Sequence, residues 1–231
     1  MTEAGSHVTL GHFTTYRARD RFWELDPDDR RAEAGAWVER LQGASDRVAL
    51  YLTSTVESGS DVMAWCSHRM GDTAAPGSFF RRRARADAPA RDYFRPVHVL
   101  WGLTRPSEYS RSARSAQKID PFDAERSPYL VVYPFTKTAA WYALPPEVRQ
   151  RLMNEHIGIG KQFRTVGQLL LYSFGLQDQE FVVVYETDDL ALFSKLVYDL
   201  RSTEARPYTL SDTPLHVGVH VDADAWIETL G

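Results

Sequence analysis

One histidine of this sequence lies among apolar residues at helical spacing. Apolar residues recur every three or four positions around His156, as on one face of an α-helix, at Val148, Leu152, Ile159 and Phe163. A lone histidine on such a face is more often a hydrogen-bonded core residue than a ligand. Gly158 and Gly160 follow it, however, and a glycine costs about 1 kcal/mol inside a helix. They favour the approach of a large group, and a planar macrocycle bound through the imidazole fits that requirement.

A tyrosine and a lysine share one face of a predicted strand. The β-branched and aromatic residues 129–135 predict a strand with Tyr133 and Phe135 on one face. Lys137, four residues after Tyr133, has the same parity. By spacing alone, a core strand tyrosine at Tyr133 and a surface lysine at Lys137 are the favoured interpretations.

The composition is that of an ordinary soluble globular protein. The 231 residues are 43% hydrophobic and 25% charged, with a net charge of −4. The basic and acidic residues are interspersed, so a nucleic-acid partner is not expected. We interpret the basic cluster from Arg81 to Arg85 as a solvated helix face. The single cysteine, Cys66, excludes an intrachain disulfide, and the other histidines considered lack the spacing of a zinc site.

The chain has neither a long apolar run nor a basic and apolar leader. These features favour a cytoplasmic protein without a membrane partner.

Two halves of the sequence resemble each other. The aromatic, Leu, Pro and Arg positions of segment 23–30 recur at identical spacing in segment 142–149. Asp61 and Asp178 follow these segments at similar distances, and the segments 90–93 and 205–208 match in turn. Three matches in the same order predict an internal duplication.

Each half is predicted to fold as strand, helix, strand, strand, helix, strand. In the second half we expect a helix from Pro146 to about Phe163, a further helix capped by Asp188 or Asp189, and strands over 129–135, 168–173, 180–185 and 215–219. Residues 73–77 are expected to form a loop.

This pattern predicts an α+β fold of duplicated ferredoxin-like βαββαβ units, which can join into an antiparallel β-barrel with the helices outside. The predicted parts are an N-terminal half (1–110), a connecting loop (111–128) and a C-terminal half (129–231) with the candidate site.

The motifs of the second half resemble a known family. Tyr133-Pro-Phe-Thr-Lys137, Trp141-Tyr142-x-Leu144, Arg149 and Glu155-His156-x-Gly158-Ile159-Gly160 are similar to the signature of the chlorite dismutase superfamily. The segments 173–181 and 200–206 continue the resemblance, which is continuous from Tyr129 to Val219 and weak before Val97. Within the superfamily the chain is most similar to HemQ-type coproheme decarboxylases, which act in haem synthesis.

The resemblance implies a role for five residues. His156 matches the proximal ligand of the haem iron, and Tyr133 matches a tyrosine that becomes the catalytic radical. Lys137 matches a lysine that engages the reacting propionate. Glu204 resembles a glutamate that hydrogen-bonds the proximal histidine. Gln168 falls at the distal position, where chlorite dismutases have arginine.

The cofactor implied by the resemblance is haem or iron coproporphyrin (Fe), which is also the substrate, and hydrogen peroxide is the co-substrate. The implied assembly is a homopentamer.

Two other functions stay open at this point. One is a haem enzyme of the chlorite dismutase or peroxidase type, and the other is a barrel that binds porphyrin without catalysis. Glutamine at 168 and tyrosine at 133 argue against the first, and His156 argues against a barrel without a ligand. Some decarboxylases carry a distal histidine in the connection before Tyr133, but here the matching segment ends in Ala113. Gln168 is therefore the better distal candidate.

Overall fold

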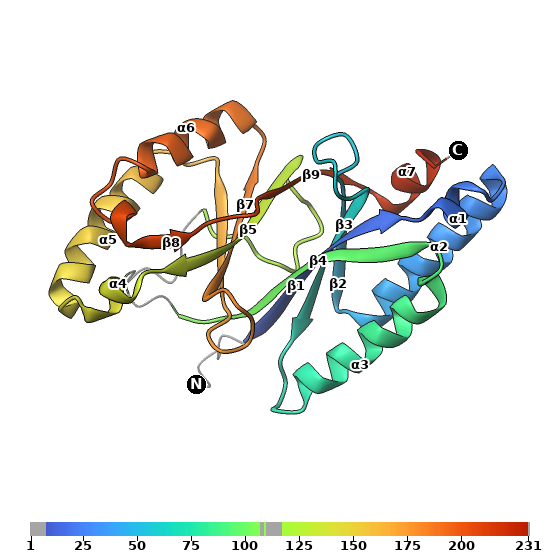
Figure 1. The fold of residues 1–231 in the computed structure, drawn as a ribbon, viewed down its shortest axis with the longest axis horizontal. Coiled ribbons are helices and arrows are strands. Elements are labelled where there is room, and N and C mark those ends of the chain that lie inside the picture. Colours follow the sequence, from blue (N-terminus) through green and yellow to red (C-terminus); the bar gives the residue numbers. More distant parts are fainter. Residues whose placement is uncertain (1–7, 107–108, 110–116, 231) are drawn as a thin grey trace, which may run out of the picture. The chain divides into compact units, whose positions relative to one another are not determined.

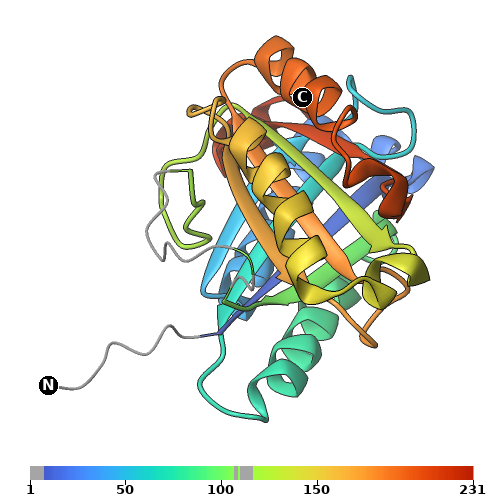
Figure 2. The ribbon, with the colours of Figure 1, turned by 90° about the vertical axis from the view of Figure 1, so that its left-hand side faces the viewer.

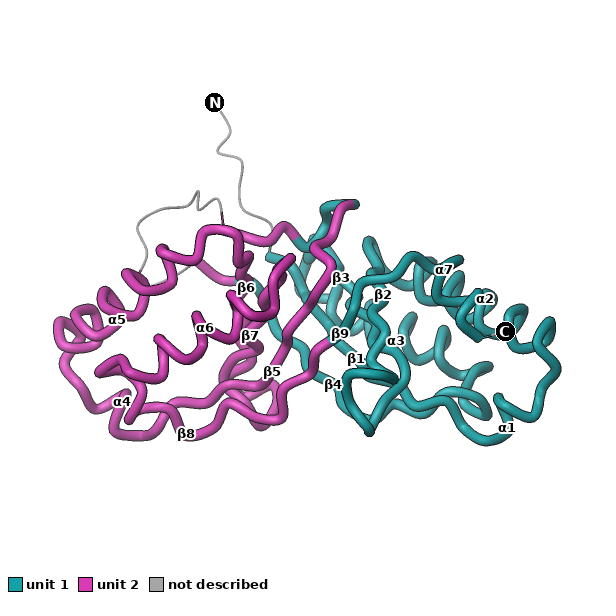
Figure 3. Tube along the Cα trace, turned by 90° about the horizontal axis from the view of Figure 1, so that it is seen from above, with its two compact units in different colours: residues 1–104, 121–124, 218–231 teal, residues 105–120, 125–217 magenta. Residues whose placement is uncertain are grey.

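The computed structural model describes residues 8–106, 109 and 117–230, which form two compact units (Figure 3). Unit 1 comprises the described parts of residues 1–104, 121–124 and 218–231, and unit 2 those of residues 105–120 and 125–217. The last described residues thus belong to the first unit. The predicted division at 1–110, 111–128 and 129–231 remains a prediction.

Unit 1 follows the predicted order of elements (Figure 1). These are β1 (Thr9–Ala18), α1 (Asp20–Trp23), α2 (Pro27–Ala44), β2 (Arg47–Leu52), β3 (Val62–Arg69), α3 (Ala75–Asp87), the 3-10 helix η1 (Ala88–Ala90) and β4 (Phe94–Thr104). The strands lie in the order β4-β1-β3-β2, and each neighbouring pair is antiparallel. Two C-terminal elements complete the unit: the end of β9 (His216–Val221) pairs with β2, and α7 (Ala223–Glu228) follows.

The start of α3 corrects a prediction. Residues 73–77 were expected to form a loop, but α3 begins at Ala75 and includes Pro76 and Gly77. Proline is tolerated there because the first amides of a helix have no intrahelical acceptor. The carboxylate of Asp72 accepts a hydrogen bond from the Ala74 amide at 2.8 Å, just before the helix.

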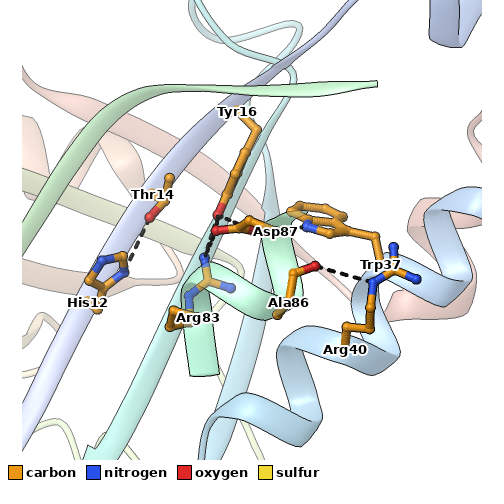
Figure 4. A network of polar contacts seen from close by, with 8 residues as sticks. All are labelled: His12, Thr14, Tyr16, Trp37, Arg40, Arg83, Ala86 and Asp87. Carbon is orange, nitrogen blue, oxygen red and sulfur yellow. Dashed lines mark hydrogen bonds and ion pairs between the residues drawn. The ribbon is translucent and has the colours of Figure 1, made fainter. Parts of the chain in front are cut away.

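The basic cluster of α3 contains one buried arginine, contrary to its interpretation as a solvated face. Arg83 is 4% exposed, because it shares the inner face of α3 with Phe79 and Ala86. Its guanidinium donates to the hydroxyl of Tyr16 and, at 3.2 Å, to the carboxylate of Asp87 (Figure 4). Arg81 and Arg85 are exposed, so the interpretation holds for them.

Aromatic rings fill the core of unit 1 around Trp37 of α2. Its ring stacks on Phe94 at a centroid distance of 4.7 Å and meets Tyr16 edge-on at 4.8 Å. The ring centroid of Trp226 of α7 lies 5.7 Å from that of Trp37. The indole nitrogen of Trp37 donates to Asp87 at 3.2 Å (Figure 4). Trp37 has no solvent exposure.

Unit 2 contains the elements that carry the candidate residues. They are β5 (Tyr129–Lys137), α4 (Ala139–Ala143), α5 (Pro146–Gly160), β6 (Gly167–Tyr172), β7 (Phe181–Thr187), α6 (Leu190–Leu200), the 3-10 helix η2 (Arg206–Tyr208), β8 (Thr209–Ser211) and the start of β9. Strand β7 lies between β6 and β5, antiparallel to both. The helix predicted to reach Phe163 ends at Gly160, and Asp189 caps α6 by accepting from two amides.

Helices α5 and α6 cover one face of this sheet (Figure 2). Val131 and Tyr185 on that face pack against Phe163, Phe193 and Leu196. Six apolar residues of the opposite face are at most 7% exposed; they are Leu130, Val132, Leu169, Leu171, Val182 and Val184.

The two matched sequence segments adopt the same local structure. Trp23 ends the short helix α1 and Tyr142 lies in the short helix α4, and each is followed by a long helix that starts at a proline, Pro27 or Pro146. Among the described residues, no helix combines the length and the apolar character needed to cross a membrane.

Candidate functional site

Strand register places two of the candidate residues, Tyr133 and Gln168, on the helix-covered face of unit 2. Val131 and Gln168 are the cross-strand partners of Tyr185, and Tyr133 pairs with Val183. Paired residues of antiparallel strands point to the same face, and every second residue follows them. Tyr133, Gln168 and Tyr185 therefore share the face on which α5 packs.

The helices leave part of this face uncovered. Leu170 of β6 is 41% exposed, and Phe174 in the following turn is 44% exposed. The ring of Phe174 meets Phe181 at 4.9 Å and Tyr142 at 6.2 Å, so these apolar side chains adjoin one another. A grouped set of exposed apolar residues indicates a binding surface, whereas single ones do not.

His156 lies on α5 and is half-buried. Burial, together with the charge of Lys137, lowers its pKa to about 4, so the imidazole is neutral at pH 7. Among the described residues, no group forms a hydrogen bond with the His156 ring, which argues against the interpretation as a hydrogen-bonded core histidine. A Cβ atom added to Gly158 or Gly160 would meet no described atom within 4 Å. The space at Gly160, about one helical turn from His156 on the same side of α5, is therefore open to the described residues.

Lys137 lies at the end of β5, close enough to His156 for their charges to interact. The pKa of Lys137 is lowered to about 8, because burial and the neighbouring Arg206 lower it more than Glu180 raises it. Its Nζ atom lies 4.3 Å from the ring centre of Trp141.

Glu180 fixes the backbone at this point, a role that no sequence pattern indicated. One carboxylate oxygen of Glu180 accepts from the Lys137 amide at 2.7 Å and from the Tyr142 hydroxyl at 2.6 Å.

Tyr133 lies beside a second tyrosine that the sequence analysis did not single out. The rings of Tyr133 and Tyr185 are stacked with a centroid distance of 6.3 Å, and their hydroxyl groups share a hydrogen bond. Burial raises the pKa of Tyr133 well above its usual range, and Tyr185 adds to the rise. Tyr133 therefore keeps its phenolic hydrogen at every physiological pH.

Glu204 lies near α5, but its carboxylate has a different partner from the one expected. It accepts from Arg151 at 2.7 Å, while the Glu204 amide donates to Glu155 at 2.9 Å. No hydrogen bond joins it to His156 among the described residues. Gln168 of β6 has an exposed side chain, and Ala113, the other distal position considered, lies outside the described residues.

Comparison with known proteins identifies the family. The sequence pattern of the chlorite dismutase family matches residues 28–221. The chain belongs to the chlorite dismutase family. The match confirms the resemblance inferred from the motifs, and it also extends into the first half, where those motifs are weak.

Two relatives in the family are named coproheme decarboxylase. The protein from Mycolicibacterium smegmatis is 30% identical over 184 residues, which are 78% of this chain and 76% of that protein. The protein from Staphylococcus saprophyticus is 39% identical over 84 residues, 34% of each chain.

A solved structure of the family shares the fold. The chlorite dismutase from Candidatus Nitrospira defluvii, in complex with imidazole, superimposes with a TM-score of 0.80 at 22% identity, over 99% of this chain and 96% of that one. The predicted α+β fold class is therefore confirmed.

Proposed function

We propose that this protein is a coproheme decarboxylase of haem biosynthesis, which converts iron coproporphyrin to haem b with hydrogen peroxide. The observation that carries the proposal is a neutral histidine with no hydrogen bond from the described residues, on a helix that packs on the sheet face that bears Tyr133 and is uncovered at Leu170. The name of the relative from M. smegmatis supports the same activity.

The residues present fit an iron porphyrin. His156 would hold the iron, because its imidazole is unprotonated and Gly160, on the same side of α5, leaves room one turn away. Leu170 and Phe174 offer apolar surface to the macrocycle. When bound, the iron porphyrin would supply, with peroxide, the oxidising power that no side chain has.

Tyr133 provides the hydrogen-abstracting group of the proposed reaction. Its neutral phenol can lose a hydrogen atom, and the resulting radical then takes a hydrogen from the β-carbon of a propionate. Loss of CO₂ and of a second electron leaves a vinyl group. Each propionic acid thus reacts with one peroxide to give one vinyl group, one CO₂ and two waters.

Lys137 orients the reacting carboxylate in this proposal. Its ammonium group is a fixed positive charge at the end of the strand that carries Tyr133, and Glu180 holds the backbone there. Gln168 supplies a neutral amide on the same face, which suits peroxide better than chlorite. Glu204 would have to leave Arg151 before it could bond to His156.

The proposal includes the finer architecture predicted from the sequence. The strand order β4-β1-β3-β2 of unit 1 and the similar elements of unit 2 support duplicated ferredoxin-like copies. Barrel closure, the homopentamer and the cytoplasmic location rest on the sequence and the family.

Product analysis tests the function. The purified protein is incubated with iron coproporphyrin and hydrogen peroxide, and the porphyrin is analysed by mass spectrometry. We expect stepwise loss of the mass of two propionate carboxyl groups, with conversion to vinyl groups. Intact propionates together with oxygen release from chlorite would establish the chlorite dismutase alternative. Binding without either reaction would establish a porphyrin-binding protein.

A further inference from the structure

The segment Gln117–Ile119 contacts β6 at the candidate distal residue. The Gln168 amide donates to the Gln117 carbonyl at 2.7 Å, and the Ile119 amide donates to the Gln168 carbonyl at 3.2 Å. The segment thus forms a one-residue parallel bridge with β6. Both main-chain groups of Gln168 are held by it.

The packing at Gly167 shows how closely this segment approaches the strand. A Cβ atom at Gly167 would lie 3.0 Å from Cγ1 of Ile119, closer than ordinary van der Waals contact. Glycine therefore permits the segment to lie against the first residue of β6.

The side chain of Gln117 reaches the C-terminal end of α5. Its Nε2 atom lies 2.8 Å from the carbonyl oxygen of Phe163 and 3.2 Å from that of Gly160, the last residue of the helix. A third carbonyl, that of Val166, is at 3.3 Å. The carbonyls of Gly160 and Phe163 also accept from the main-chain amides of Phe163 and Val166, each at 3.1 Å, so the Gln117 side chain is a second donor to the turn that follows α5. His156 lies four residues, about one turn, before Gly160.

We propose that Gln117 is a positioning residue of the site. Its side chain holds the end of the helix that carries His156, while its main chain holds the strand residue Gln168. One residue thus sets the separation between the two elements that would lie on either side of a planar ligand. The inference rests on the proposed function, because it assigns the separation to an iron porphyrin. Residues that orient a metal-binding side chain, without contacting the metal themselves, change the affinity for the metal group and its absorption spectrum.

Two substitutions separate the hydrogen bonds of Gln117 from its volume. Gln117→Met keeps a similar length and removes the donors, whereas Gln117→Lys places an ammonium group with three donors near the three carbonyls. Gln162→Met, at an exposed position just after α5, is the matched control.

The first readout uses the protein without porphyrin. In Gln117→Met, amide hydrogen exchange across residues 160–168 should be about three- to tenfold faster, because local opening loses one or two hydrogen bonds. Gln117→Lys should restore slow exchange, and Gln162→Met should match the wild type.

The second readout is the absorption spectrum and affinity of bound iron coproporphyrin. We expect Gln117→Met to shift the Soret band and to weaken binding about tenfold, with recovery in Gln117→Lys. Unchanged exchange in Gln117→Met would overturn the proposal. So would faster exchange with a wild-type spectrum and affinity. Failure of the wild type to bind iron coproporphyrin would refute the proposed function, and exchange in the porphyrin-free protein would still decide whether Gln117 joins α5 to β6.

Discussion

Replacing Tyr133 by phenylalanine tests the proposed chemistry most directly. The substitution removes one hydroxyl group and keeps the ring that packs against Tyr185 at 6.3 Å. Tyr185 is 7% exposed, so its hydroxyl loses its hydrogen-bond partner in a buried place. A buried polar group left without a partner costs about 1–3 kcal/mol. The free energy of unfolding should fall by that amount, and each kcal/mol should lower the Tm by about 2–4 °C.

Decarboxylation should fall far more than stability does. Tyr133→Phe has no O–H bond to oxidise, so conversion of iron coproporphyrin should drop by orders of magnitude while His156 still binds the iron. The assay is mass spectrometry of the porphyrin after peroxide addition, with the absorption spectrum recorded first to confirm binding.

A double variant separates the two effects. Tyr133→Phe with Tyr185→Phe removes both hydroxyl groups, and removing both partners of a buried hydrogen bond costs less than removing one. We expect the double variant to regain much of the lost stability and none of the activity, as measured by urea unfolding and product mass. Equal conversion by wild type and Tyr133→Phe would refute the radical role. Recovery of activity in the double variant would show that stability alone explained the loss.

Three other substitutions probe the site and its support. His156→Ala should shift the Soret band and weaken iron porphyrin binding, and an unchanged spectrum would assign the iron ligand elsewhere. The affinity of the wild type should stay constant above pH 5 and fall as the pH drops through about 4, since only the neutral imidazole binds iron. Titration followed by absorbance checks both predictions. Lys137 loses its charge as the pH rises through about 8, so the rate of decarboxylation should decline there. Lys137→Ala should be slower at neutral pH and should show no such decline near pH 8. A decline retained in this variant would contradict the assignment. Asp189→Ala removes the cap of α6 and should lower the free energy of unfolding by about 1 kcal/mol, measured in urea, with Asp188→Ala as the neighbouring control.

The elements of unit 2 were predictable because their signals are local. The run of β-branched and aromatic residues defines β5, and Pro146 with the apolar spacing defines α5. The end of α5 was placed too late at Phe163, because the chain turns after Gly160 while Phe163 still packs in the same core. Apolar periodicity reports burial and cannot distinguish the last helical turn from a buried turn that follows it.

Contacts between distant segments were outside the reach of sequence patterns. Tyr185 is adjacent to Tyr133 only through the register of β7 on β5, and Gln117 meets Gly160 across 43 positions of the chain. Arg83 was misread because a charge run looks solvated, although its place on α3 turns it toward Tyr16 and Asp87. Glu204 was assigned by likeness, and its pairing with Arg151 depends on side-chain geometry.

The aromatic core around Trp37 bears on how many ligands one chain can take. Trp37 lies seven residues after Arg30, and His156 lies seven residues after Arg149, so the sequence repeat sets these two side chains at equivalent positions. In unit 1 the indole of Trp37 has no lone pair to donate to an iron ion, and Phe94, Tyr16 and Trp226 occupy the surrounding space. Replacing Trp37 by histidine would therefore supply an iron ligand but no space for a porphyrin. A binding titration should saturate at one equivalent of iron porphyrin per chain, with the second copy retained as a scaffold.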